Sequence, residues 1–168
     1  MKSIKPAIHS VLLLLLSSLI WLQPVSAEEA FGSVFLEDLK TSEKQFLKKY
    51  IQNGPLIINF WATYCQPCAA EMPAIQKLAA ENLHVRLLFI NIDAAQNRVL
   101  VQKKVADWGI SETVLLDIYQ IAAKKYVPSL SVPATFLVNS KGQIFYQSIG
   151  YNRNTIRNLQ AKLQLLKK

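Results

Sequence analysis

Apolar and polar positions alternate along the chain in blocks that predict strands and helices in turn. Two nearly continuous apolar runs, residues 56–61 and 85–92, are typical of strands that a sheet buries on both faces. The expected helices cover residues 46–51, 65–82, 95–108, 118–126 and 155–166, and further short strands are expected at 114–116, 134–138 and 143–149. Strands that alternate with helices pair in parallel, and the hairpin expected from the strands at 134–138 and 143–149 adds an antiparallel edge. The pattern therefore predicts an α/β sandwich with a mixed central sheet flanked by helices.

Capping and helix-breaking residues mark the ends of the predicted helices. The sequence Ser42-Glu43-Lys44-Gln45 has the form of a capping box and predicts a helix start just before residue 46. Pro67 would lie in the first turn of the helix that begins at Cys65, where its missing N–H costs nothing. Pro73 would lie deeper in that helix and is expected to kink it. Residues 28–39 have no clear period, and a short edge strand is expected there.

The first 27 residues have the pattern of a secretory signal peptide. Lysines start the segment, an apolar run follows at residues 11–22, and small or compact residues, Val25-Ser26-Ala27, offer a cleavage site. The run is shorter than the roughly 20 apolar residues that a membrane-spanning helix needs, so cleavage is favoured over an uncleaved anchor. The sequence therefore predicts export to the periplasm or the outer face of a bacterial cytoplasmic membrane, with one domain in residues 28–168.

Composition and charge exclude several classes of protein. The chain of 168 residues is 51% apolar and 18% charged, which is not the composition of a disordered or low-complexity chain. Its net charge is +8, but the lysine pairs lie on separate predicted elements and no segment interleaves aromatic residues with arginines. A generally positive surface is therefore favoured over nucleic-acid binding. Two cysteines can build neither a multi-bridge scaffold nor a four-cysteine zinc site.

The two cysteines, Cys65 and Cys68, follow a predicted buried strand and open a predicted helix. Their spacing places both sulfurs on one helical turn, close enough to form a disulfide. The free amides and the positive dipole end at the helix start stabilise a thiolate on Cys65. We therefore expect Cys65 to be the attacking sulfur and Cys68 to be the resolving sulfur, which breaks the mixed disulfide.

Two other interpretations of the cysteine pair are weaker. A metal site needs more ligands, and beyond the signal segment the only histidine is His84, at a predicted strand start. A structural disulfide that closes so short a loop restrains little of the unfolded chain. Redox activity is therefore favoured, with no metal and with no cofactor other than the disulfide itself.

Two segments of the chain resemble those of a known family. Residues 60–68, Phe-Trp-Ala-Thr-Tyr-Cys-Gln-Pro-Cys, followed by Glu71-Met72-Pro73, resemble the active-site segment of the thioredoxin superfamily, and within it that of the exported TlpA/ResA-like thiol-disulfide oxidoreductases. Residues 132–138, Val-Pro-Ala-Thr-Phe-Leu-Val, match the family's second landmark. The resemblance covers about residues 42–166 and implies a thioredoxin-like three-layer sandwich. It also implies that Pro133 is a cis-proline facing the cysteines, in a loop that holds a substrate strand mainly by backbone groups.

The resemblance also suggests roles for residues around the pair. Asn59 stands where thioredoxin has a buried acid that moves protons, which an amide cannot do. Glu71 matches an acid of ResA-like proteins and would accept or relay the Cys68 proton if it is partly buried with a raised pKa; a solvated helix carboxylate is the alternative. Trp61 and Tyr64 are expected to form an apolar collar beside the sulfurs, with plain packing as the alternative. The residues expected to contact the substrate are Trp61, Tyr64, Gln66, Pro67, Val132 and Pro133.

The direction of electron flow depends on the reduction potential rather than on the fold. Gln66-Pro67 between the cysteines resembles reducing family members, whereas Val132 before the proline resembles the oxidant DsbA. We expect a monomeric reductase of protein disulfides that a membrane electron donor keeps reduced. Its expected partners are apocytochrome c, a copper-delivery protein or misoxidised exported proteins. The alternatives are a disulfide-forming oxidant or isomerase of the same fold, or a non-catalytic thioredoxin-fold binding module.

Overall fold

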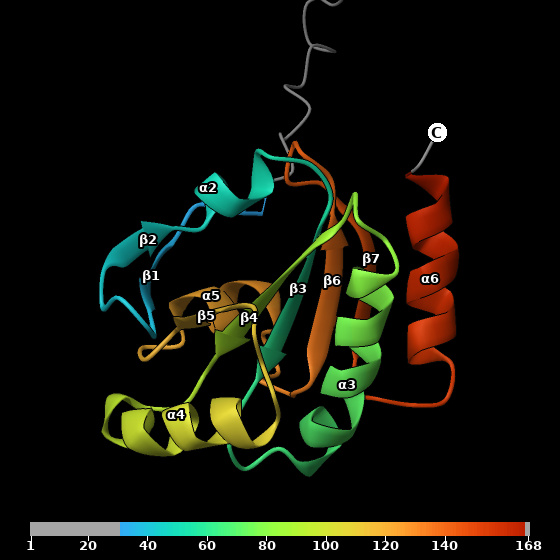
Figure 1. Ribbon diagram of the computed structural model, residues 1–168. Helices are drawn as coiled ribbons and strands as arrows, with labels where there is room; N and C mark the ends of the chain where they lie inside the picture. The colour runs from blue at the N-terminus through green and yellow to red at the C-terminus, as the bar shows by residue number, and fades with distance from the viewer. Residues whose placement is uncertain (1–30, 167–168) are drawn as a thin grey trace, which may run out of the picture.

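The structure is a computed structural model that describes residues 31–166, so the predicted signal peptide at residues 1–27 lies outside the described residues. Its seven strands form one sheet, with helices on both faces (Figure 1). The strands are β1 (Phe35–Asp38), β2 (Lys44–Phe46), β3 (Leu56–Trp61), β4 (Arg86–Asn91), β5 (Thr113–Leu116), β6 (Ala134–Val138) and β7 (Ile144–Ile149). The helices are α2 (Lys48–Ile51), α3 (Gln66–Ala80), α4 (Arg98–Asp107), α5 (Ile121–Tyr126) and α6 (Thr155–Leu165), and a 3₁₀ turn, η2 (Ala95–Asn97), precedes α4.

Strand pairing gives the sheet the order β2-β1-β5-β4-β3-β6-β7. The strands β3, β4 and β5 run parallel, whereas β6 pairs antiparallel with β3 and β7 pairs antiparallel with β6. On the other side, β1 joins β5 in antiparallel orientation. Every residue of β3 is buried, as its continuous apolar run predicted. The predicted mixed sheet and α/β class are confirmed.

Alternating side chains of the central strands define two separate helical layers. Asn59 of β3 points to the face covered by α3, where it contacts Glu71. The next residue, Phe60, points to the opposite face. There it packs against Phe31, which stacks on Tyr126 of α5. Because α6 lies beside α3 on the first face (Figure 1), the molecule is a three-layer α/β/α sandwich.

The segment 42–45 departs most from the predicted elements. Lys44–Phe46 forms strand β2, and helix α2 has four residues with no side-chain cap, so the predicted capping box is wrong. The reason is the hairpin between β1 and β2, where the Asp38 carboxylate accepts the backbone N–H groups of Lys40 and Thr41 at 2.8 and 2.9 Å. These bonds fix a turn in place of a helix start. The described chain therefore begins with two strands: β1 lies where a short strand was expected, and β2 lies where a helix start was expected.

The other predicted elements are present, with bounds that differ by a few residues. Helix α3 has Cys65 as its N-cap residue and runs through Pro73 as one helix. Helix α5 begins later than residue 118 because Gln120 takes a left-handed backbone conformation, with φ 56°, that an α-helix does not contain. Among the helices of residues 31–166, none has the length and apolar character needed to cross a membrane.

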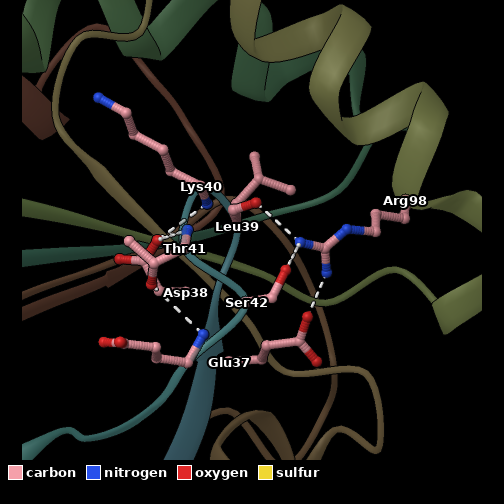
Figure 2. Close-up of polar contacts among 8 residues, drawn as sticks. Glu37, Asp38, Leu39, Lys40, Thr41, Ser42 and Arg98 are labelled. Atoms are coloured by element: carbon pink, nitrogen blue, oxygen red, sulfur yellow. Dashed lines mark hydrogen bonds and ion pairs between the residues drawn. The ribbon is translucent and has the colours of Figure 1, made fainter.

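Arg98, the first residue of α4, ties that helix to the β1–β2 hairpin. Its guanidinium pairs with the carboxylate of Glu37. It also donates hydrogen bonds to the Leu39 carbonyl at 2.8 Å and to the Ser42 hydroxyl at 2.9 Å (Figure 2). Because a charged donor strengthens each bond, this group of contacts joins the hairpin firmly to the body of the domain.

Replacing Arg98 with methionine should lower the free energy of unfolding by about 1–2 kcal/mol, because the hairpin loses its charged donor while the aliphatic stem keeps its packing. Urea unfolding followed by circular dichroism measures this difference. Arg153→Met is the control, since Arg153 is exposed, and its effect should stay within about 0.5 kcal/mol. Equal losses in the two variants would contradict a stabilising role for the Arg98 contacts.

Candidate active site

Cys65 and Cys68 are joined by a disulfide, with their Cα atoms 5.3 Å apart. Cys65 is 5% exposed and Cys68 is fully buried. The sulfur of Cys65 also accepts the backbone N–H of Cys68 at 3.2 Å. The less buried cysteine is therefore the one whose sulfur receives an amide of the first helical turn, where a thiolate is stabilised.

The strand-to-helix connection explains this placement. Cys65 has an extended backbone, with φ −86° and ψ 96°, and serves as the N-cap of α3. Pro67 lies in the first turn of α3, where the helix needs no N–H from it. Cys65 therefore lies just beyond the end of the buried strand β3, and the first turn of α3 places Cys68 in the interior.

Below the disulfide, Glu71 belongs to a buried polar network that spans three elements. The amide nitrogen of Asn59 donates to Glu71 Oε2 and to Thr135 Oγ1, both at 2.9 Å. The hydroxyl of Thr135 donates to Glu71 Oε1 at 3.1 Å. All three side chains are completely buried. The network therefore joins the cysteine-bearing helix α3 to strands β3 and β6.

Burial changes the acidity of Glu71. Loss of hydration raises the pKa of its carboxyl from 4.5 to about 7, although the hydrogen bonds from Asn59 and Thr135 act in the opposite direction. Glu71 lies one helical turn after Cys68. The alternative of a solvated helix carboxylate is wrong, because the carboxyl has no exposed surface. Asn59, which cannot carry a proton itself, instead supports the acid on α3.

The peptide bond between Val132 and Pro133 is cis, as the family resemblance implied. Strand β6 follows this bond and pairs antiparallel with β3, with Ala134 opposite Phe60. The Val132–Pro133 loop therefore lies at the same end of the sheet as the loop that leads to Cys65. Within the described part of the chain, the Pro133 carbonyl accepts the N–H of Gly150 at 2.7 Å, whereas neither backbone group of Val132 makes a backbone hydrogen bond.

The remaining predicted contact residues divide into exposed and buried ones. Tyr64 is 70% exposed, and Gln66 and Pro67 are exposed beside it. Trp61 differs from the predicted collar, because its side chain is completely buried and packs against Trp108 with ring centroids 5.2 Å apart. Since Trp61 ends a strand that is covered on both faces, it offers no surface to a substrate.

Side chains that could bind a metal ion form no cluster among the described residues. Among residues 31–166, no group of three or more histidine, cysteine, aspartate or glutamate side chains is placed to hold a metal ion. His84, the further candidate ligand in the sequence, is exposed.

Sequence reasoning missed two polar residues of this region. Thr135 holds Glu71, and Asp93 holds the loop before Cys65 through Thr63. The available signal was a polar side chain inside or at the end of an apolar strand, since such groups are buried only with partners. The pattern could not name those partners, because they lie 64 and 30 residues away in sequence.

A disulfide at the start of a helix, beside a cis-proline loop at one end of a mixed sheet, is the arrangement of a thiol-disulfide protein with the thioredoxin fold. The family model described as Redoxin matches residues 26–163, and the chain therefore belongs to the Redoxin family.

Curated relatives are similar to this chain in sequence, and a solved structure shares its fold. The chain is 31% identical over 121 residues to "Thiol-disulfide oxidoreductase ResA" of Halalkalibacterium halodurans. The aligned region covers 71% of this chain but only 65% of that relative. It is 27% identical over 148 residues to "Sporulation thiol-disulfide oxidoreductase A" of Bacillus subtilis, covering 84% of this chain and 88% of the relative. A secreted disulfide oxidoreductase of Mycobacterium tuberculosis shares the fold, with a TM-score of 0.65 at 20% identity over 80% of this chain and 96% of the other.

Proposed function

We propose that the protein is an exported thiol-disulfide oxidoreductase that reduces disulfides in other proteins. The observation that carries this is the asymmetry of the pair: Cys65 keeps 5% of its surface exposed, whereas Cys68 is fully buried one turn from a buried acid. The similarity to curated thiol-disulfide oxidoreductases supports the chemistry. The signal-peptide pattern of residues 1–27 supports export.

The proposed reaction has two exchange steps. The Cys65 thiolate attacks one sulfur of the substrate disulfide, and the other substrate sulfur leaves as a thiolate. The Cys68 thiolate then attacks the sulfur of Cys65, which re-forms the disulfide and releases the second substrate thiolate. The substrate gains two electrons and the pair loses two, so a dithiol donor must reduce the pair again. A membrane electron donor is the proposed source.

Glu71 would accept the proton that Cys68 must lose before the second step. A base works best when its pKa lies near the working pH, and burial brings the pKa of Glu71 to about 7. The hydrogen bonds from Asn59 and Thr135 meet both carboxylate oxygens, so the ionised form has partners inside the protein.

Substrate would bind as an extended segment beside the Val132–Pro133 loop. The backbone groups of Val132 have no backbone partner in residues 31–166, and they lie at the same end of the sheet as Cys65. Tyr64, Gln66 and Pro67 supply exposed surface around the sulfur. Backbone pairing of this kind tolerates many sequences, which suits exported proteins as substrates, with apocytochrome c and copper-delivery proteins as the candidates.

A redox titration tests the direction of electron flow. The Cys65–Cys68 pair, equilibrated with glutathione or dithiothreitol buffers, should have a reduction potential below about −200 mV, as thiol-disulfide reductases do. A value of about −120 mV, like that of DsbA, would instead indicate a disulfide-forming oxidant. Failure of the protein to speed insulin reduction by dithiothreitol would favour a non-catalytic binding module.

A further inference from the structure

The carboxylate of Asp93 lies buried where strand β4 ends, and it contacts the loop that leads to Cys65. Asp93 is 3% exposed. Its Oδ2 accepts the backbone N–H of Thr63 at 2.8 Å and the side-chain amide of Asn91 at 2.7 Å. Its Oδ1 accepts the Thr63 hydroxyl at 2.7 Å and the side-chain amide of Asn97 at 3.3 Å. One carboxylate therefore receives donors from the active-site loop, from the end of β4 and from η2.

A single peptide group connects Asp93 to Cys65. The N–H of Thr63 and the carbonyl of Ala62 belong to the same planar peptide. The N–H points to Asp93, and the carbonyl accepts the backbone N–H of Cys65 at 3.1 Å. Because the peptide is planar, a bond that fixes the Thr63 N–H also fixes the direction of the Ala62 carbonyl. The hydrogen bond from this N–H to a carboxylate also makes the Ala62 carbonyl a stronger acceptor. The contact at Asp93 thus acts on the backbone of Cys65.

The loop that Asp93 holds also carries the exposed surface next to the sulfur. Tyr64, which is 70% exposed, lies between Thr63 and Cys65. Disulfide exchange requires the attacking sulfur to approach along the line of the bond that breaks, and small displacements from such a geometry slow a reaction strongly. A loop that positions both the sulfur and the neighbouring surface therefore affects the reaction with a large, oriented substrate.

The contacts of the Asp93 carboxylate within the described residues are hydrogen bonds from uncharged donors. None of the ion pairs found among residues 31–166 includes this carboxylate. Its partners are uncharged donors, and Thr63 supplies both a backbone and a side-chain donor. The Thr63 hydroxyl is thus a contact that can be removed without changing any charge at the site.

We propose that Asp93 is a positioning residue that, through Thr63, orients Cys65 for in-line attack on a protein disulfide. The step is attack of the Cys65 thiolate on one substrate sulfur, with the other sulfur leaving as a thiolate. This inference rests on the proposed role of Cys65 as the attacking sulfur.

The test compares an oriented protein substrate with a small reagent that needs no docking. Thr63→Val and Asp93→Asn should each slow insulin reduction by about tenfold. Alkylation of Cys65 by iodoacetamide, measured in a Cys68→Ser background where it is the single thiol, should not slow by more than about twofold, since a small reagent needs little orientation. Thr63→Ser keeps the hydroxyl and should restore insulin reduction to the unmodified rate.

Asp117→Asn is the control for a purely structural effect. Asp117 is 2% exposed, and its carboxylate accepts the N–H groups of Ile121 and Ala123 at the start of α5 rather than groups of the loop before Cys65. This variant should lose stability but keep the unmodified rate of insulin reduction. Unchanged insulin rates in the Thr63 and Asp93 variants, or equal slowing of both reactions, would overturn the proposal. Absence of turnover in the unmodified protein would refute the proposed function and this inference with it.

Discussion

Replacing Cys65 with serine should reduce the rate of insulin reduction to the background rate of dithiothreitol alone. A serine hydroxyl does not ionise at neutral pH, so no nucleophile remains at the N-cap of α3 to attack a substrate disulfide. The rate of insulin precipitation measures the loss. Serine keeps the size of the side chain and still accepts the N–H of residue 68, so the fold should be preserved, which circular dichroism checks.

The matching variant, Cys68→Ser, should fail at the second step instead. Cys65 would still attack, but the mixed disulfide would persist because no resolving sulfur remains. A covalent adduct should therefore appear on a non-reducing gel with Cys68→Ser and be absent with Cys65→Ser. Adducts that form equally in both variants, or turnover that survives in Cys65→Ser, would reverse or refute the assigned roles.

Replacing Glu71 with glutamine should change how stability depends on pH. The pKa of Glu71 in the folded protein is raised from 4.5 to about 7, so the fold favours the protonated form. Its stabilising contribution is therefore fully present below pH 4.5 and is lost as the pH rises through about 7. The unmodified protein should lose about 3 kcal/mol relative to Glu71→Gln across this range, because each pKa unit corresponds to about 1.4 kcal/mol.

The same substitution should slow the resolving step. With ionised Glu71 as the proton acceptor, release of substrate from the mixed disulfide should speed up as the pH rises through about 7. Glu71→Gln should lose this inflection and resolve the mixed disulfide more slowly at neutral pH, by about a hundredfold. Stopped-flow measurement of release at several pH values gives both results.

Glu81→Gln is the control for Glu71. Glu81 follows the last turn of the same helix, is 57% exposed and lies 3.9 Å from Lys77. Its replacement should leave the pH dependence of stability and of the resolving step unchanged. If Glu71→Gln behaves like this control, Glu71 is not the proton acceptor.

Local patterns predicted the parts of the structure that depend on local chemistry. The continuous apolar runs marked the buried central strands, and the spacing of Cys65 and Cys68 after such a run placed a disulfide at a helix start. The cis bond before Pro133 was implied by resemblance alone. The capping-box form at residues 42–45 was misleading, because the side chain of Asp38 closes a hairpin turn there that competes with a helix start.

By itself, the sequence predicted the disulfide pair and which sulfur attacks first, because the positive end of a helix and the shielding of the second cysteine follow from positions along one segment. Only the tertiary structure decided the surroundings of that pair. It buried Trp61 against Trp108, buried Glu71 between two strands and brought Asp93 to the loop before Cys65. The physical reason is that burial, and the hydrogen bonds that make it tolerable, depend on residues distant in sequence. A carboxyl such as Glu71 has its pKa set by those neighbours rather than by its own segment.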